Sequence, residues 1–246
     1  MHGWRRAQHD PRDYKLAVSA VVHPPVLSLR SLMPAVRNQL NIGSCTANGG
    51  AVMAEFVIWK ETAQMPAHFS RLDLYAITRE LEGTPLSEDS GCNVRNVCKA
   101  LRKWGICYET TWPYVPAKFS VNPPRAAAVE ALHHRATSFH LVSGLAGIRQ
   151  CIADGYPMIF GFDCFESLMS DEVGRTGIVP MPGTNDQGIG GHCVTCVGYN
   201  DSAGMLEFQN SWGTDWGDNG FGWLPYDYVT QHMASDFVTL RRETTQ

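Results

Sequence analysis

The 246-residue sequence lacks the features that would indicate a nucleic-acid-binding or membrane protein. Its formal net charge is −4, and its lysines and arginines are scattered rather than striped, which argues against a nucleic-acid partner and against a membrane surface. The candidate leader, residues 16–29, follows charged residues, is interrupted by His23, Pro24 and Pro25, and is too short to span a bilayer. Internal repeats and low-complexity tracts are also absent. We therefore expect a soluble protein with no nucleic-acid or membrane partner.

The eight cysteines do not by themselves indicate a disulfide framework, because such frameworks belong to short secreted chains. Cys98 falls on the apolar stripe of a predicted helix, which favours a core position. Cys193 and Cys196 form a C-x-x-C, but strand residues three apart point to opposite faces, which favours packing over a redox or zinc site. Cys92 and Cys107 flank one predicted helix and are the pair to examine for a disulfide. We expect neither a metal nor a cofactor.

One cysteine has a different setting, at the end of the loop formed by residues 37–44. The segment 49–60 that follows is apolar nearly all round, which predicts a buried helix with Gly43 and Ser44 as its start signal. Cys45 would then lie at the N-terminus of this helix. Unpaired backbone N–H groups and the helix dipole favour thiolate there, and thiolate is the nucleophilic form. The alternative is simple packing, since free cysteine is among the most buried residue types.

Two predicted strands farther along the chain carry a candidate base and a residue to orient it. Residues 190–199 predict a strand with His192 near its start. Within residues 207–213 a second strand is predicted, and the amide residue Asn210 stands at its end. The turn at residues 201–204 is of the kind that joins adjacent strands in a hairpin. Such a hairpin would bring His192 and Asn210 together at one end of the sheet. The sequence thus supplies a nucleophile, a base and an orienting residue.

These motifs together resemble the papain family of cysteine peptidases. The Cys-Thr-Ala-Asn at 45–48, the Gly-Trp-Arg-Arg at 3–6 and the Asp-Pro-Arg-Asp-Tyr at 10–14 resemble a bacterial or viral subgroup of it. The resemblance rests on Gln39 six positions before Cys45, on the Gly-Ser-Cys that ends at Cys45, and on the glycine directly before His192. Its most specific part is the block 210–221, Asn-Ser-Trp-Gly-Thr-Asp-Trp-Gly-Asp-Asn-Gly-Phe. The four elements stand in the family's chain order and cover nearly the whole sequence, which argues against coincidence.

The resemblance implies a role for each reactive residue. Cys45 is expected to be a thiolate that attacks the scissile carbonyl, paired with His192 as an imidazolium that protonates the leaving amine. Water would then hydrolyse the thioester with His192 as base. Asn210 would orient the imidazole, Trp212 would cover that bond from solvent, and Gln39 would bind the oxyanion with the backbone N–H of Cys45. The alternative for Gln39 is a loop amide that ties down its own turn.

The resemblance also implies a peptide groove beside Cys45. The residues expected to bind substrate there are Gly91, Asn93, Val94, Gly190, Gly191, Cys193 and Trp212. The chain departs from the family signature at Ile42 and Thr46, and position 42 therefore cannot form the family disulfide. Val94 and Arg95 stand where many members carry paired glycines. Because of these departures, the contacts of the groove with the substrate backbone are expected to differ from those of many family members.

The change of pattern along the chain predicts an α+β, papain-like fold with two lobes. We expect a helical lobe that carries the nucleophile and an antiparallel sheet or barrel lobe that carries the histidine and asparagine, with the site in the cleft between them. The expected divisions are an extended N-terminal arm at 1–35, the helical lobe at 36–120 and the β lobe at 121–246. Helices are expected at 49–60, 70–83 and 93–104, and strands at 139–142, 158–163, 192–199, 205–210, 221–224 and 237–240.

Three segments leave alternatives open. The arm either ties the lobes together as a strap, which we favour, or lies over the cleft as a lid. The Gly-rich insertion at 166–190 is either a lid or a plain variable loop. The alanine-rich segment 125–136 predicts an exposed helix face that carries His133 and His134.

The sequence as a whole predicts a cysteine peptidase that acts on a peptide or protein substrate as a monomer. One alternative is an acyl-transfer enzyme or amidase that uses the same thioester. Another is a papain-fold binding protein with narrow or lost peptidase activity, which the presence of every reactive residue disfavours.

Overall fold

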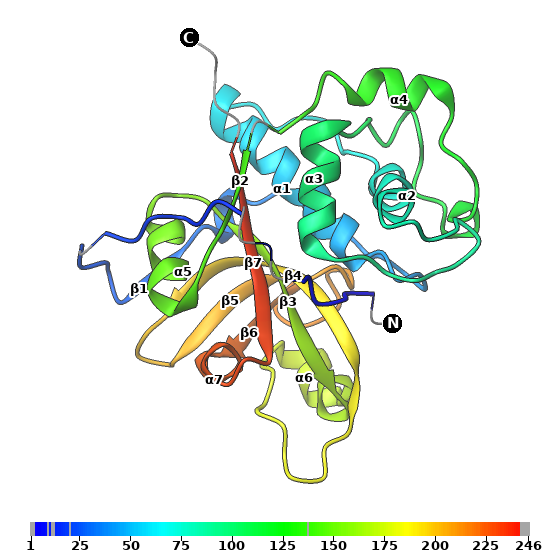
Figure 1. Cartoon of the computed structure of the whole chain (residues 1–246). Coiled ribbons are helices and arrows are strands. Elements are labelled where there is room, and N and C mark those ends of the chain that lie inside the picture. The colour runs from blue at the N-terminus through cyan, green and yellow to red at the C-terminus, as the bar shows by residue number, and fades with distance from the viewer. Residues whose placement is uncertain (1–2, 9, 11–12, 20, 137, 242–246) are drawn as a thin grey trace.

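A computed structural model describes residues 3–8, 10, 13–19, 21–136 and 138–241. Its helices α1 to α4 gather on one side of an antiparallel sheet (Figure 1), which gives the expected α+β fold. The helices are α1 (Cys45–Thr62), α2 (Arg71–Leu81), α3 (Val94–Lys103), α4 (Arg125–Ala131), α5 (Gly144–Ala153), α6 (Asp171–Thr176) and α7 (Tyr226–Thr230). The strands are β1 (Val26–Ser28), β2 (Ser138–Leu141), β3 (Met158–Phe165), β4 (Gly188–Asn200), β5 (Met205–Gln209), β6 (Phe221–Pro225) and β7 (Ala234–Arg241).

The strands of the described chain form one sheet in the order β2-β7-β3-β4-β5-β6, and β1 pairs with the end of β4. Every pairing is antiparallel. The long strand β4 lies at the centre, and a turn at its end leads into β5 as a hairpin. Both β3 and β4 are apolar along most of their length because each packs on both faces. The hairpin predicted from the sequence is therefore confirmed.

Helix α1 fills the space between the other helices and the sheet, and its residues from Cys45 to Val57 are all buried. Its apolar character all round follows from these contacts on every side. Two glycines permit the close approach: a Cβ at Gly49 would lie 2.8 Å from Ile159 Cγ2, and one at Gly50 would lie 2.5 Å from Val97 Cγ1. The start of α1 is thereby held directly against β4.

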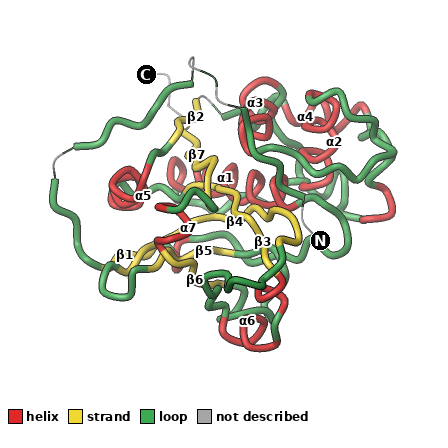
Figure 2. Tube along the Cα trace, turned by 60° about the horizontal axis from the view of Figure 1, so that its bottom comes forward, coloured by secondary structure: helices red, strands yellow, loops and turns green. Residues whose placement is uncertain are grey.

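The arm predicted at 1–35 binds the rest of the molecule at several points between residues 13 and 34. Backbone hydrogen bonds of 2.7 and 2.8 Å join Leu16 N to Leu141 O and Leu141 N to Tyr14 O. Farther along, β1 adds to the sheet and a short 3₁₀ helix, η1 (Arg30–Leu32), follows it. Figure 2 shows the segment that leads to β1 passing along the outside of the molecule beyond α5. Each of these contacts fits the strap alternative.

Two local predictions are corrected by the structure. Helix α4 ends at Ala131, so His133 and His134 lie beyond it and not on a helix face. Instead, the ring of His134 packs against Phe69 and Tyr108, because the chain turns back toward the helical core. Segment 166–190 is not a bare loop, since it contains 3₁₀ helix η3 (Glu166–Met169), α6 and the start of β4. The lid alternative for this segment stays a prediction.

All eight cysteines are free and buried. Cys92 and Cys107 are therefore not joined in this structure. Cys193 and Cys196 belong to different core clusters, which is the result expected for two strand residues on opposite faces. Across the ranges that the structure describes, none of the helices has both the length and the apolar character needed to cross a membrane.

Candidate active site

The loop before α1 is fixed by hydrogen bonds that set the position of Cys45. The Asp89 carboxylate accepts from Gly43 N at 2.9 and 3.0 Å. The hydroxyl of Tyr114 lies 2.6 Å from Ser44 Oγ and donates to Gln39 O at 2.7 Å. Because side chains from outside the loop hold it on both sides, the first turn of α1 begins at a defined point.

His192 and Asn210 are brought together by the β4–β5 hairpin. The Nε2 atom of His192 lies 2.8 Å from Asn210 Oδ1, and the same oxygen accepts from Ser211 N at 2.8 Å. The Trp212 ring stacks on the imidazole at a centroid distance of 4.6 Å, and the Phe162 ring meets it edge-on at 5.9 Å. These contacts fix the plane of the imidazole and shield its bond to Asn210.

The Cys45 sulfur, at the start of α1, meets β4 at the residue directly after His192. It is fully buried, and backbone hydrogen bonds from Cys193, the residue directly after His192, and from Gly3 reach it. Burial raises the pKa of the Cys45 thiol to about 11, although these hydrogen bonds lower it. This direction is the opposite of the lowered pKa expected from the sequence. Removal of water from the site outweighs the helix N-terminus in this arrangement.

Gln39 is also fully buried, and its side chain is held at both ends. Its Oε1 accepts from Ser211 Oγ at 2.7 Å, and its Nε2 donates to Ile42 O at 3.0 Å. One of the two amide hydrogens thus ties down the turn, as in the alternative weighed for this residue.

The first described residues of the arm occupy the space beside Cys45. Cys92 N donates to Gly3 O at 2.8 Å, Arg5 N donates to Cys92 O at 3.1 Å, and Trp4 N donates to Gly191 O at 3.1 Å. Cys92 belongs to the helical side and Gly191 to the sheet. We call the space between Cys92 and Gly191 the groove. Residues 3–5 fill it as an extended segment.

Glycines make this close fit possible. A Cβ at Gly91 would lie 1.9 Å from Gly3 O, and a Cβ at Gly3 would lie 1.9 Å from Gly43 O. Any side chain at these positions would displace the backbone of the arm. The arm thus lies directly on the loop that precedes Cys45.

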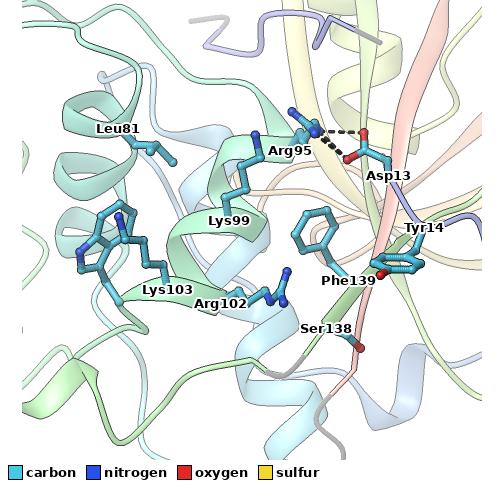
Figure 3. A pocket seen from close by; sticks show the side chains of 10 residues that line it. Asp13, Tyr14, Leu81, Arg95, Lys99, Arg102, Lys103, Ser138 and Phe139 are labelled. Carbon is cyan, nitrogen blue, oxygen red and sulfur yellow. Dashed lines mark hydrogen bonds and ion pairs between the residues drawn. The ribbon is translucent and has the colours of Figure 1, made fainter. Parts of the chain in front are cut away.

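Ion pairs hold the arm a few residues farther along. Arg95, at the start of α3, donates to both oxygens of Asp13 at 2.7 and 2.8 Å and to Asp10 at 2.5 Å. Figure 3 shows the Arg95–Asp13 pair at the edge of a pocket of about 650 Å³ that Lys99, Arg102 and Phe139 also line. The Asp13 side chain is only 6% exposed. A buried ion pair therefore anchors the arm next to the groove.

The residues expected to bind substrate divide into two groups. Gly91 and Gly191 contact the arm in the groove, Trp212 covers His192, and Cys193 meets the Cys45 sulfur through its backbone. Gly190 pairs with Cys164 in the sheet, Asn93 caps α3 through its side chain, and the side chain of Val94 is buried in the helical core. The last three thus have structural roles here.

The sequence did not predict that the Cys92 backbone binds the arm or that Trp4 binds Gly191 in the groove. A sequence pattern does not reveal a role carried by backbone atoms, as at Cys92. Trp4 did give a signal, since a tryptophan in a polar, arginine-rich segment needs an apolar surface elsewhere in the molecule. Among the residues that the structure describes, no group of three or more His, Cys, Asp or Glu side chains is arranged to hold a metal ion.

Comparison with known families gives a clear result. The family model described as "Papain family cysteine protease" matches residues 27–239. The chain belongs to this family. It is accordingly a cysteine-type peptidase, as the sequence motifs predicted.

Individual relatives of the chain indicate the same family. The chain is 38% identical over 217 residues to an uncharacterised peptidase C1-like protein of Acanthamoeba polyphaga mimivirus, a match that covers 84% of this chain and 70% of that protein. It is 25% identical to cysteine proteinase 3 of Entamoeba histolytica, over 87% of this chain and 66% of that protein. The crystal structure of xylellain, a cysteine protease from Xylella fastidiosa, superposes with a TM-score of 0.89 at 31% identity, and the match covers 98% and 96% of the two chains.

Proposed function

We propose that Cys45, His192, Asn210 and Gln39 hydrolyse peptide bonds through a thioester intermediate. The observation that carries this proposal is the His192–Asn210 hydrogen bond of 2.8 Å at the point on β4 where Cys193 N reaches the Cys45 sulfur. Covalent acyl transfer requires a nucleophile, a base and a residue that orients the base, all at one site.

In the first half of the proposed reaction, His192 takes the thiol proton of Cys45 as the sulfur attacks the scissile carbonyl carbon, and the carbonyl π electrons move to oxygen. The backbone N–H of Cys45 and the free hydrogen of the Gln39 amide bind that oxygen. The tetrahedral intermediate collapses as the C–N bond breaks, and His192 gives a proton to the leaving amine. The product is a thioester on Cys45.

In the second half, a water molecule replaces the amine. His192, now neutral, takes a proton from the water as its oxygen attacks the thioester carbonyl. The C–S bond then breaks, which releases the carboxylic acid and regenerates the sulfur nucleophile. Asn210 accepts from His192 Nε2 throughout and keeps the other ring nitrogen directed at the sulfur.

We also propose that arm residues 3–5 keep the peptidase latent. The segment lies where an extended substrate would have to bind, and it uses backbone hydrogen bonds to Cys92 and Gly191 that a peptide would use. Residues 13–34 would then act as the strap and residues 3–5 as the lid, so that the two alternatives weighed for the arm apply to different parts of it.

The catalytic proposal is tested with Cys45→Ala in the full chain carrying Trp4→Ala, so that the arm does not block the groove. Cys196→Ala in the same background is the matched control, because Cys196 is buried on the opposite face of β4. Under reducing conditions Cys45→Ala is expected to lower peptide turnover by about six orders of magnitude, to the detection limit, since a lost nucleophile leaves only binding and oxyanion contributions. Cys196→Ala is expected to retain turnover. Iodoacetamide should label Cys45 as activity is lost. Turnover that survives in Cys45→Ala would overturn the proposal.

A further inference from the structure

Arg71 is the first residue of α2, and this position is unfavourable for the helix itself. Ser70 caps α2 by accepting from Asp73 N, so Arg71 stands in the first helical turn. A cation there lies at the positive end of the helix dipole, where an anion is favoured. The Arg71 side chain is nonetheless buried and ordered by several contacts. The reason for an arginine at this position therefore lies in those contacts and not in the helix.

Three oxygens from different segments converge on the Arg71 guanidinium. Its Nη1 donates to Asn38 O and to Asn48 Oδ1, each at 3.1 Å, and its Nη2 donates to Glu109 Oε1 at 2.9 Å. Asn38 directly precedes Gln39, and Asn48 lies in the first turn of α1. One planar group thus joins the two segments that carry the proposed oxyanion donors.

A chain of hydrogen bonds continues from Asn48 to the backbone of Gln39. Asn48 Nδ2 donates to Ser44 Oγ at 3.1 Å. Ser44 Oγ lies 2.6 Å from the hydroxyl of Tyr114, which donates to Gln39 O at 2.7 Å. Because the tyrosine hydrogen is used on Gln39 O, the Ser44 hydroxyl donates to Tyr114. Every donor in the chain therefore points away from the Arg71 charge, and this alignment strengthens each bond.

The Tyr114 ring is held by the same guanidinium. The Cζ atom of Arg71 lies 3.8 Å from the centroid of this ring, which is a cation–π contact. Burial raises the pKa of the Tyr114 hydroxyl, although the side chains of Ser44 and Asn48 and the charge of Arg71 lower that pKa. The hydroxyl therefore stays protonated at neutral pH and keeps its hydrogen for Gln39 O.

We propose that Arg71 is a positioning residue, whose guanidinium sets the distance between Gln39 and the backbone N–H of Cys45 so that both bind the oxyanion. This inference rests on the proposed peptidase function and deepens it. Ser211 holds Gln39 from the side of the sheet, since its Oγ donates to Gln39 Oε1 and its carbonyl accepts from Gln39 N, each at 2.7 Å. Arg71 holds the same residue from the helical side, directly at Asn38 O and through Tyr114 at Gln39 O.

The test uses the full chain with Trp4→Ala, so that the arm does not limit the rate. Arg71→Met keeps an unbranched side chain and removes every donor. A misplacement of about 1 Å costs up to about a hundredfold in rate, so kcat on a reporter peptide is expected to fall about tenfold to a hundredfold. KM is expected to stay within about threefold, because the lost interaction belongs to the transition state.

The rate of Cys45 alkylation by iodoacetamide distinguishes positioning from general damage. Alkylation forms no oxyanion, so Arg71→Met is expected to leave its rate within about twofold. A parallel fall in kcat and in the alkylation rate would show that the whole site is disrupted and would refute the proposal.

Two further variants identify what the guanidinium acts on. Arg71→Lys keeps the charge but not the planar fork, so it is expected to recover less than about threefold of the lost kcat. When Gln39→Ala is already present, Arg71→Met is expected to lower kcat by less than about threefold, because the distance between two donors no longer matters once one is gone. Full recovery in Arg71→Lys, or a full additional loss in the Gln39→Ala chain, would refute the proposal.

Arg149 on α5 provides the matched control, because it makes the same kinds of contact outside the site. Its Nε donates to Asp201 Oδ1 at 2.7 Å, and its Cζ lies 5.2 Å from the centroid of the Tyr226 ring. Arg149→Met is expected to leave kcat within about twofold. Equal losses of kcat in Arg149→Met and Arg71→Met would show a general effect of removing an arginine ion pair and would refute the proposal.

Hydrogen exchange separates failure of this proposal from failure of the peptidase proposal. In the full chain with Cys45→Ala and Trp4→Ala, Arg71→Met is expected to raise the exchange rate of the backbone amides of residues 38–45 by about tenfold or more, and Arg149→Met is not. That result would support positioning by Arg71 even if the Cys45 protein cleaved nothing. Unchanged exchange in Arg71→Met would refute positioning while leaving peptide hydrolysis intact.

Discussion

The proposed catalytic side chains and the arm residues Gly3 and Trp4 are all buried at one site, but they are held in different ways. His192 and Gln39 are fixed by side-chain hydrogen bonds to Asn210 and Ser211, at 2.8 and 2.7 Å. Residues 3–5 instead bond through their backbone to Cys92 and Gly191, as any extended peptide would. The first set of bonds positions the chemistry and the second competes with substrate. Substitutions in the two sets should therefore change turnover in opposite directions.

The largest effect is expected from Gln39→Ala on the catalytic side. Loss of one oxyanion donor lowers kcat by about a hundredfold to a thousandfold. The measurement is kcat on a reporter peptide in the full chain with Trp4→Ala, so that groove access does not limit the rate. The rate of Cys45 alkylation is expected to change little, because alkylation forms no oxyanion.

Asn38→Ala is the control for Gln39→Ala. Asn38 lies in the same loop and bonds Leu40 N at 2.8 Å and Trp212 O at 3.3 Å, so it shares the structural setting. A fall in kcat below threefold is expected for it. Equal losses for the two substitutions would show that Gln39 acts by holding the loop and not by binding the oxyanion.

An intermediate effect of opposite sign is expected from Trp4→Ala. Burial raises the pKa of Cys45 to about 11, so the thiol is neutral at pH 7 in the latent chain. Without the indole the arm leaves the groove more often, water returns, and the pKa falls because the thiolate is solvated again. Turnover and the rate of iodoacetamide labelling at pH 7 should each rise by about tenfold or more. The midpoint of the labelling rate against pH should move downward.

Trp104→Ala provides the comparison for Trp4→Ala. Trp104 is a partly buried tryptophan at the end of α3, outside the groove. It should leave both the labelling midpoint and turnover close to those of the unmodified chain. A midpoint that stays near 11 in Trp4→Ala would mean that residues 3–5 do not control the state of the thiol.

Much of this site could be predicted from the sequence because its chemistry is carried by side chains at defined places in secondary structure. The hairpin placed His192 beside Asn210, and the all-round apolar pattern placed Cys45 at the start of a buried helix. The pKa of Cys45 could not be predicted in the same way. It depends on burial and on backbone hydrogen bonds from Cys193 and Gly3, and Gly3 lies more than 40 positions away from Cys45 with no pattern that links the two.

The fold shows the same division between local and long-range information. The helices predicted at 70–83 and 93–104 begin at Ser70 and Asn93, whose side chains cap them by accepting from Asp73 N and Asn96 N. The strand β1 was missed because three residues in a proline-rich arm carry no period, and only the edge of β4 makes them a strand. His134 was misplaced for a similar reason, since packing against Phe69 and Tyr108 overrides the local helical tendency.

The smallest effect is expected from Arg95→Ala, which weakens the arm without touching the groove. Arg95 binds Asp13 and Asp10, and these bonds keep residues 3–5 at a high effective concentration next to Cys92 and Gly191. Removing the guanidinium leaves the Asp13 carboxylate, only 6% exposed, without its charge partner, so this part of the arm should detach more often. Turnover in the full chain is expected to rise about threefold to tenfold, less than for Trp4→Ala because the indole still packs on Gly161 and Gly191. Arg102→Ala removes the same charge from the same face of α3, where Figure 3 shows it in the pocket next to the Arg95 ion pair, and should leave turnover unchanged. If both arginine variants raised turnover equally, the charge of α3 rather than the Arg95 ion pair would control the arm.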